Sequence, residues 1–386
     1  MKIIGLISGT SHDGIDAISV DFELDGQTLR AKVSGAGQQE YPAELRKRLL
    51  DALPPNKTTF EEVCQLDTLI AKQFAESAKR LLSPDTDLIS SHGQTVFHWV
   101  EQNKALGTTQ LGQPAWIATS TGVPVLADLR INDIAQGGQG APVVPVLDLL
   151  TLSEDETVIA SVNLGGIANI TVLDGHSIRA AYDTGPASAL IDAVVVSYKL
   201  HPEGFDRDGA IAARGESDSE LLDLLLAEGF YALEEPKSTG KELFHIDYLQ
   251  AVLSKLGREL TSEDLVATVT ELTARTLSDQ IKKHGVQKMV VAGGGVHNKT
   301  LMNSIEQKTG LQAVSFAEYG ISQDLKEAFA MALIGWLSAH NLPSTFPEST
   351  GASSPAILGT LTPGASGFPS FENLHNMPNR LVIEGG

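Results

Sequence analysis

The strongest constraint on the fold is an arrangement that occurs twice along the chain. Near the start, the apolar run 2–8 ends in "GTSHDG" and is followed by a second apolar run, 15–22. Further on, "TVIASVNLGGIANITVLDG" shows an apolar run, a Gly-Gly turn flanked by asparagines, and another apolar run. Two apolar runs joined by a glycine-rich turn are typical of a β-hairpin. One such hairpin opening each half of the chain predicts a duplicated fold.

The segments around the hairpins predict alternating strands and helices. "LRAKVSGAG" predicts a third strand, and "DLISSHGQTVFHW" a strand that ends in a glycine turn. A Thr59/Glu62 capping box precedes apolar residues spaced three to four apart, which predicts a helix, and a short helix is expected in "GQPAWIATSTG". "SIRAAYDTGPASALIDAVVVSY" predicts a strand, a turn and a helix with Pro186 in its first turn. Two more helices are expected at about 263–284 and 322–340, with the strand "KMVVAGGG" between them.

The length of the chain indicates more than one domain. With 386 residues, 42% of them hydrophobic, it exceeds a typical single domain and can form a substantial core. We expect a two-lobed α/β protein with an N-terminal lobe 1–130, which the C-terminal tail could join, a C-terminal lobe 131–365 and a tail 366–386. "INDIAQGGQGAP" is expected to be a flexible connection, and the Pro/Gly/Ser/Thr-rich segment from about residue 343 to be loop.

Charge and cysteine content restrict the partners and the setting. Lys and Arg total 28 against 48 Asp and Glu, a formal charge of −20 without a basic block, which argues against nucleic acid or an anionic membrane as a partner. The single cysteine, Cys64, excludes an intrachain disulfide and is typical of a reducing compartment. No apolar run reaches the roughly 18 residues of a membrane span, and the N-terminus has no signal-peptide pattern, so we expect a cytoplasmic protein.

The turn "GTSHDG" carries more polar groups than a hairpin needs. A decorated turn is the simplest interpretation. However, the backbone N–H groups of Gly9 to Ser11 could bind phosphate oxygens, and Asp13 could hold Mg²⁺ through water. An acidic protein that binds phosphate needs such local donors and a divalent cation. "NLGGIAN" is a candidate for a second phosphate loop.

Two further glycine-containing segments have competing interpretations. The glycines of "VVAGGGVHN" allow close approach of a nucleotide, or serve a tight connection between a strand and a helix. "STGKE" resembles the end of a Walker A motif, but Glu235 stands where its first glycine should be and Glu242 where Ser or Thr is required. We therefore expect no Walker A site.

Several polar side chains are candidates for chemistry. Asp183 is expected at the end of a strand just before a helix, where carboxylates face ligands in α/β sheets, although a helix N-cap is the alternative. Glu327 is the anomaly in the apolar segment "LKEAFAMALIGWL", so it needs a hydrogen bond, a charged partner or a polar cleft, and a structural ion pair remains open. Other polar side chains suit either a hydroxylated ligand or a solvated loop: Gln94, Thr95, Arg130 and Asp133. His92 and His98 have no third metal ligand in sight.

Taken together, these motifs resemble the anhydro-N-acetylmuramic acid kinases, a family within the actin, sugar kinase and Hsp70 ATPase superfamily. The resemblance covers about residues 4–359 and rests on "SGTSHDGID", "HGQTVFH", "ADLRINDIAQGGQGAP", "NLGGIAN", "YDTGP", "PKSTGKELF", "AGGGVHN" and "KEAFA", in that order. It implies a two-lobed actin-like fold of duplicated RNase H-like domains with ATP and Mg²⁺ in a central cleft. It also implies a cytoplasmic homodimer that acts on an amino sugar in peptidoglycan recycling.

The resemblance also implies a reaction and roles for residues. The sugar 1,6-anhydro-N-acetylmuramate would be opened by water and phosphorylated by ATP, giving N-acetylmuramate 6-phosphate and ADP. Asp183 would be the general base and Glu327 its helper, and Thr95, Gln94 and Arg130 would join them as substrate contacts. The implied nucleotide contacts are Gly9, Thr10, Ser11, His12, Asp13, Gly14, Ile15, Asp16, Asn163, Gly165, Gly166, Gly293, Gly294, Gly295 and Asn298, with Asp13 also near Mg²⁺.

Two departures from the family pattern and three rival functions remain. The family commonly has an apolar residue in place of His12, and "GPGN" where this chain has Gly185-Pro186-Ala187-Ser188.

One rival function is a superfamily kinase for another sugar, which would phosphorylate a free hydroxyl. Another is a non-catalytic ATP-gated sugar sensor, expected to lose Asp183 or to carry a DNA-binding appendage, and the third is an actin-like assembly protein.

Overall fold

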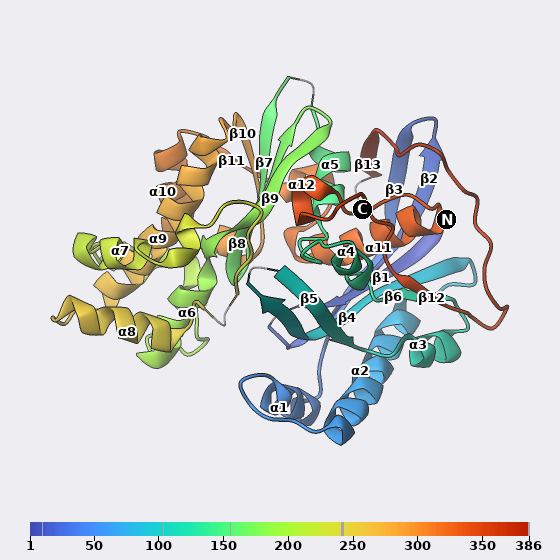
Figure 1. Cartoon of the computed structure of the whole chain (residues 1–386), viewed down its shortest axis with the longest axis horizontal. Coiled ribbons are helices and arrows are strands. Elements are labelled where there is room, and N and C mark those ends of the chain that lie inside the picture. The colour runs from blue at the N-terminus through green and yellow to red at the C-terminus, as the bar shows by residue number, and fades with distance from the viewer. Residues whose placement is uncertain (10, 103, 155, 241–242, 385–386) are drawn as a thin grey trace. The chain divides into compact units, whose positions relative to one another are not determined.

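A computed structural model describes residues 1–9, 11–102, 104–154, 156–240 and 243–384. The chain forms two compact units, each with its own β-sheet and helices (Figure 1). Unit 1 comprises Met1–Thr151 and Tyr319–Gly386, and unit 2 comprises Leu152–Glu318. The expected α/β character is confirmed in both units.

The sheet of unit 1 is built on the first predicted hairpin. Strands β1, β2 and β3 are antiparallel, β4 lies parallel to β1 on its other side, and β6 lies parallel to β4. The C-terminal segment adds both outer strands: β12 pairs antiparallel with β6, and β13 pairs parallel with β3. The strands are β1 (Lys2–Ser8), β2 (Gly14–Asp25), β3 (Thr28–Glu40), β4 (Thr86–Glu101), β5 (Lys104–Leu111), β6 (Val125–Ala127), β12 (Thr360–Thr362) and β13 (Arg380–Glu384).

Helices cover both faces of this sheet. The side chains of β1 alternate between the two faces, so each face carries side chains that pack against a helix. Ile4 and Leu6 belong to the core formed with α2, whereas Gly5 faces α11 so closely that a Cβ atom there would lie 2.2 Å from the Ala328 carbonyl oxygen. Helix α2 begins as predicted, with the Glu62 N–H donating to Thr59 Oγ1 at 3.1 Å. The helices are α1 (Ala43–Ala52), α2 (Phe60–Leu81), α3 (Pro114–Thr121), α4 (Ile131–Ala135), α5 (Pro145–Leu152), α11 (Lys326–Ala339) and α12 (Pro347–Thr350).

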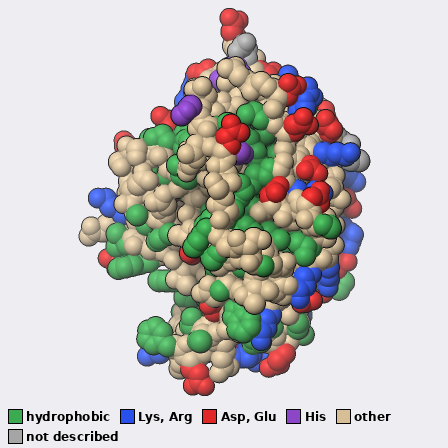
Figure 2. Space-filling model, turned by 90° about the vertical axis from the view of Figure 1, so that its right-hand side faces the viewer, with side chains coloured by type: hydrophobic (Ala, Val, Ile, Leu, Met, Phe, Trp, Pro, Cys, Tyr) green, Lys and Arg blue, Asp and Glu red, His purple; other side chains and the backbone are tan. Residues whose placement is uncertain are grey.

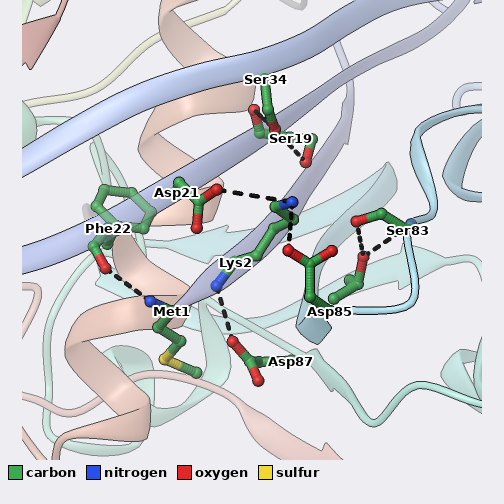
Figure 3. Close-up of polar contacts among 10 residues, drawn as sticks. Met1, Lys2, Ser19, Asp21, Phe22, Ser34, Ser83, Asp85 and Asp87 are labelled. Carbon is green, nitrogen blue, oxygen red and sulfur yellow. Dashed lines mark hydrogen bonds and ion pairs between the residues drawn. The ribbon is translucent and has the colours of Figure 1, made fainter.

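Polar contacts of Lys2 bind the start of β1 to neighbouring segments (Figure 3). Its Nζ lies 2.7 Å from Asp85 and 3.6 Å from Asp21, and its backbone N–H donates to Asp87 at 2.8 Å. The amino terminus of Met1 also donates to the Phe22 carbonyl at 2.7 Å. The hydrogen bond from Lys2 lowers the pKa of Asp85 to about 2. These polar contacts hold the start of β1 between β2 and the loop that leads into β4.

Unit 2 is built on the second predicted hairpin. Strands β7, β8 and β9 are antiparallel, β10 is parallel to β7, and β11 is parallel to β10. Apolar side chains of α9 and α10, such as Leu277 and Leu301, pack with Val162 and Ile170 of this sheet. The strands are β7 (Val158–Leu164), β8 (Ile167–Asp174), β9 (Ser177–Pro186), β10 (Lys288–Ala292) and β11 (Ala313–Ser315), and the helices are α6 (Ser188–Ser197), α7 (Ser219–Leu226), α8 (Ile246–Leu256), α9 (Ser262–Lys283) and α10 (Lys299–Thr309).

The two sheets share one topology. Unit 1 has the order β3-β2-β1-β4-β6 between its added edge strands, and unit 2 has the order β9-β8-β7-β10-β11. Three antiparallel strands are followed in each by two strands parallel to the first. The duplicated fold of two RNase H-like units, predicted from the repeated hairpins and the resemblance, is therefore confirmed.

The polar connection 131–140 is more ordered than its composition predicts. Residues 131–135 form α4, and the fully buried carboxylate of Asp133 accepts hydrogen bonds from the Gly140 N–H at 2.8 Å and from Thr350 Oγ1 at 2.7 Å. The expected flexible connection is thus wrong. Because these contacts bind the segment to α12, it belongs to unit 1, and the units differ from the expected division at residues 130 and 365.

Two smaller expectations also differ from the structure. Pro186 is the last residue of β9 and not part of the first turn of α6, which has Ala187 as its N-cap. The segment after residue 343 contains α12, β12 and β13 besides its loops, and these strands complete the sheet of unit 1.

The surface agrees with the charge pattern of the sequence. The face shown in Figure 2 carries acidic and basic side chains intermixed, without an extended basic patch. Across the residues that the structure describes, no helix is long and apolar enough to cross a membrane.

Candidate active site

The predicted first phosphate loop connects β1 and β2 in unit 1. The His12 N–H donates to the Gly9 carbonyl at 3.3 Å, and Ser11 Oγ donates to Asp13 Oδ1 at 2.6 Å, so the loop is folded by its own polar groups. His12 has a positive φ of 52°. The carboxylate of Asp13 is exposed, whereas the predicted contact Thr10 lies outside the described residues.

The loop is shorter than the predicted segment, because Gly14, Ile15 and Asp16 are the first residues of β2. A Cβ at Gly14 would lie 2.4 Å from the Gln39 carbonyl oxygen, so close packing of β3 requires this glycine. The Ile15 side chain is in the core, and the whole residue is buried where β2 pairs with β3. Burial raises the pKa of Asp16, the hydrogen bond from Gln38 opposes this, and the charge of Asp13 adds to the increase.

Gln94 holds this loop from β4. Its Nε2 donates to the Gly9 carbonyl at 3.2 Å, and its Oε1 accepts from Ser8 Oγ at 2.7 Å. The Gln94 side chain is fully buried, so it positions the loop. Its amide group, which the sequence analysis assigned to the substrate, forms its hydrogen bonds within the protein. The next residue, Thr95, is partly exposed, and its Oγ1 accepts from Gln110 Nε2 at 3.1 Å.

Arg130 is oriented by a histidine that the motif analysis did not assign to the site. Arg130 Nε donates to His92 Nε2 at 2.8 Å, and His92 Nδ1 lies 3.0 Å from the Gly93 carbonyl oxygen. These contacts require the proton on Nδ1 and leave Nε2 as the acceptor. Burial and then the charge of Arg130 lower the pKa of His92 to about 3, so the imidazole is neutral. The sequence signal for this role was a histidine directly before "GQT".

Glu327 lies in the first turn of α11, and its side chain is exposed while residues 328–337 behind it are buried. The protein around the Glu327 carboxyl group reduces its hydration, which raises its pKa. The positive charge of Arg130 opposes this increase, and the negative charge of Asp16 adds to it. Water reaches the carboxylate and screens part of these effects. Unit 1 therefore brings the charges of Arg130, Asp16 and Glu327 within electrostatic reach of one another.

The adjacent Lys326 forms a buried ion pair with Asp148 at 2.6 Å.

In unit 2, the turn between β7 and β8 caps a helix. The Gly166 carbonyl accepts from the Ala187 N–H at 2.9 Å, and the Gly165 carbonyl accepts from the Ser188 N–H at 3.0 Å. The first N–H groups of α6 are thus bound to the glycine turn. Asn163, at the end of β7, is half-buried.

The three glycines after β10 have different roles. Cβ atoms at Gly293 and Gly295 would lie 2.6 Å from Asn163 Oδ1 and 2.7 Å from Leu164 Cβ, so both glycines allow packing against the end of β7. Gly294 is exposed with open space around it. Asn298 is the N-cap of α10, where its Oδ1 accepts from the Leu301 N–H at 3.0 Å. Gly294 is the member of this group with room for a ligand.

Asp183 lies within β9, opposite Asn169. Its Oδ2 accepts a hydrogen bond from the Thr239 N–H at 2.9 Å, and its own N–H donates to the Lys237 carbonyl at 3.0 Å. The segment "PKSTG" therefore lies beside the carboxylate and orients it. Sequence reasoning missed this contact because the two partners are 56 residues apart. Lys241 and Glu242, which complete the Walker-like string, lie outside the described residues.

Comparison with known proteins decides the family. The family model described as "Anhydro-N-acetylmuramic acid kinase" matches residues 1–364. The chain belongs to the anhydro-N-acetylmuramic acid kinase family. Curated members from Rhodococcus erythropolis and Streptomyces avermitilis are each 46% identical to it, with 100% of both chains covered. A member from Caldanaerobacter subterraneus is 37% identical over 93% of this chain and 96% of its own length.

A similarity to a solved structure is weaker than these family matches. The activator of the 2-hydroxyisocaproyl-CoA dehydratase from Clostridium difficile is 12% identical, with a TM-score of 0.43 over 86% of this chain and 93% of that chain. This similarity is too low to support a conclusion about fold or function. The family match covers every motif of the candidate site.

Proposed function

We propose that the protein is an ATP-dependent kinase that opens 1,6-anhydro-N-acetylmuramate with water and phosphorylates it to N-acetylmuramate 6-phosphate, releasing ADP. The observation that carries the proposal is the family match over residues 1–364. Support from the geometry is the carboxylate of Asp183, which the Thr239 N–H holds at 2.9 Å.

Asp183 is assigned as the general base. The 6-oxygen of the substrate is part of the internal ether and carries no proton that a base could remove. The base instead takes a proton from water as the water oxygen bonds to the anomeric carbon. The bond from that carbon to the 6-oxygen breaks, and the released oxygen bonds to the γ-phosphorus of ATP as the bond from that phosphorus to the ADP oxygen breaks and ADP leaves. A positioned general base contributes about 10²- to 10⁴-fold to such a step.

Residues of unit 1 are assigned to the sugar. Arg130 is fixed by His92, and Thr95 is partly exposed, so both suit contacts with substrate hydroxyl or carboxylate groups. Glu327, whose carboxylate reaches solvent at the start of α11, is assigned as the helper of the base. Gln94 is assigned to the loop that it holds.

ATP and Mg²⁺ suit the polar groups of the loops. Mg²⁺ neutralises the phosphates when it is bound and supplies electrostatic stabilisation of the transferred phosphoryl group. Among the described residues, no three His, Cys, Asp or Glu side chains form a metal-binding group, so we assign Mg²⁺ to the phosphates, with Asp13 reaching it through water. The charges of this loop fit a cation. The exposed carboxylate of Asp13 contributes to the raised pKa of Asp16, and a bound cation would offset the repulsion between these two carboxylates. The loop around Gly9 and the exposed Gly294 are assigned to the nucleotide.

We extend the proposal to the setting of the enzyme: a cytoplasmic homodimer in peptidoglycan recycling. The single cysteine is typical of a reducing compartment and supports the cytoplasmic location. The resemblance of the motifs supports the homodimer and the role in recycling.

The reaction is tested with the substrate, Mg-ATP and ¹⁸O-labelled water. We expect a 6-phosphate product with the label at the anomeric hydroxyl. Without release of ADP the kinase assignment is wrong, and a phosphorylated product without the label would indicate the rival kinase that uses a free hydroxyl.

The role of Asp183 is tested by Asp183→Asn, with Asp223→Asn on the exposed face of α7 as the matched control. We expect Asp183→Asn to abolish turnover while ATP binding persists, and the control to behave as the wild type. Turnover at the wild-type rate in Asp183→Asn would refute the assignment.

A further inference from the structure

The segment 235–239 of unit 2 carries charged side chains that the proposed reaction does not use. We propose that Glu235 and Lys237 are positioning residues that hold the Thr239 N–H on the carboxylate of Asp183. The inference rests on the proposed function for its kinetic consequence, but its structural part stands on contacts within unit 2.

The segment meets Asp183 through two backbone groups. The Lys237 carbonyl accepts from the Asp183 N–H at 3.0 Å, and the Thr239 N–H donates to Asp183 Oδ2 at 2.9 Å. The first contact fixes the strand and the second fixes the carboxylate. A backbone donor keeps its direction only if the segment that carries it is itself held in place.

Glu235 binds the start of this segment to the end of α9. Its Oε2 lies 3.1 Å from Lys283 Nζ and 3.3 Å from His284 Nε2. Tyr182, the neighbour of Asp183 in β9, places its hydroxyl 2.8 Å from the same His284 nitrogen. Burial opposes ionisation of Glu235, but the hydrogen bond and positive charge of Lys283, together with the nearby Tyr182 and His284 side chains, outweigh it and lower the pKa of the carboxyl. Glu235 is therefore an anion that joins the segment to both α9 and β9.

Lys237 binds the middle of the segment to the short helical turn 229–232. Its Nζ donates to the carbonyl oxygens of Phe230 and Tyr231, each at 3.2 Å, and lies 4.7 Å from the centre of the Phe230 ring. These contacts direct the ammonium group toward the protein. Two side chains, two residues apart, thus attach the backbone just before Thr239 at two separate places.

The attachments have a predictable kinetic role. A hydrogen bond to a charged group contributes about 1.5–3 kcal/mol, and about 1.4 kcal/mol corresponds to a tenfold change. Release of the segment would weaken the Thr239 contact and let the carboxylate rotate. The expected loss in kcat is therefore about 10- to 100-fold, with little change in ATP binding.

The experiment compares Glu235→Ala, Lys237→Met and Lys283→Ala with two matched controls, Glu234→Ala and Lys282→Ala, whose side chains are exposed neighbours of the pair. The wild type and each variant are assayed for kcat and KM with anhydro-N-acetylmuramate and Mg-ATP, per ATP-binding site. The double variant Glu235→Lys/Lys283→Glu restores an ion pair with reversed charges. Hydrogen exchange of the Thr239 amide is measured without substrate.

We expect lower kcat at unchanged KM for ATP in Glu235→Ala and Lys237→Met, a smaller loss in Lys283→Ala, and partial recovery in the double variant. The Thr239 amide should exchange faster in the same variants and not in the controls. Unchanged kcat and exchange would overturn the proposal, as would a loss of activity that follows only the fraction of folded protein. An inactive wild type would refute the proposed function, whereas the exchange of Thr239 still tests the attachment.

Discussion

Gly5 in β1 offers the sharpest test of how the fold supports the candidate site. In the variant Gly5→Ala, the new methyl group would lie 2.2 Å from the Ala328 carbonyl oxygen and 2.6 Å from the Ala332 nitrogen, both backbone atoms of α11. No side-chain rotation relieves such a clash. The helix must therefore move away from the sheet by about 1 Å to reach a normal contact.

The expected cost follows from the size of this displacement. Overpacking a core costs about 1–3 kcal/mol, and a clash with backbone on a helix buried along its length belongs at the upper end, about 3 kcal/mol. For a unit of roughly 220 residues, this lowers the melting temperature by about 6–12 °C. Because Glu327 directly precedes Ala328 in α11, we also expect a lower kcat in the folded variant.

The matched control is Gly37→Ala in β3, where an added Cβ has nothing within 4 Å. This variant should melt at the wild-type temperature or slightly above it, since alanine lowers the entropy of the unfolded chain. Thermal unfolding followed by circular dichroism and the steady-state rate are the two measurements. Equal melting temperatures for Gly5→Ala and Gly37→Ala would show that the close packing of β1 against α11 is wrong.

Two further outcomes are expected from charged pairs of unit 1. The pKa of Asp85 is about 2 in the folded protein and about 4 in an unfolded chain, so its pairing with Lys2 stabilises the fold above pH 4 and this contribution is lost as the pH falls from 4 to 2. Asp85→Asn should therefore flatten the pH dependence of the unfolding midpoint in this range, and identical profiles would contradict the pairing. Lys326→Met leaves the buried Asp148 carboxylate without its ion pair and should cost about 3–5 kcal/mol. The double variant Lys326→Met/Asp148→Leu should recover part of this loss in chemical denaturation, and a double variant less stable than Lys326→Met would refute the argument.

Local patterns made much of the fold predictable. The two hairpins, the Thr59 start of α2 and the strand β10 depend on turn residues, a capping residue and apolar periodicity, which act over a few positions. The duplicated topology followed from the same local signals, because two equal hairpins at equivalent places restrict the arrangement of the remaining strands. The Asn298 cap of α10 was also within reach, since Asn precedes Leu301 by three positions as an N-cap requires.

Contacts between distant parts of the chain were not predictable. Gln94 binds the Gly9 carbonyl 85 residues away, and nothing in the string "HGQT" tells which backbone its amide meets. The apolar helix α11 has no polar face that would show which sheet it covers, so its place in unit 1 was missed. The same holds for Asp133, whose burial depends on Thr350, 217 residues later. Short-range physics gives the elements, whereas these partners follow from the tertiary packing.

The return of residues 319–386 to unit 1 reverses the usual order of folding during synthesis. Domains generally fold as units, and the N-terminal one is normally first. Here unit 2 is continuous and complete once residue 318 has left the ribosome, whereas β1, β2 and β4 must wait for α11, and β3 for β13. The earlier half of unit 1 therefore exposes the Gly5 face of its sheet while unit 2 is made. The middle of this polypeptide is the first part that can reach its native state, and the two ends reach theirs together.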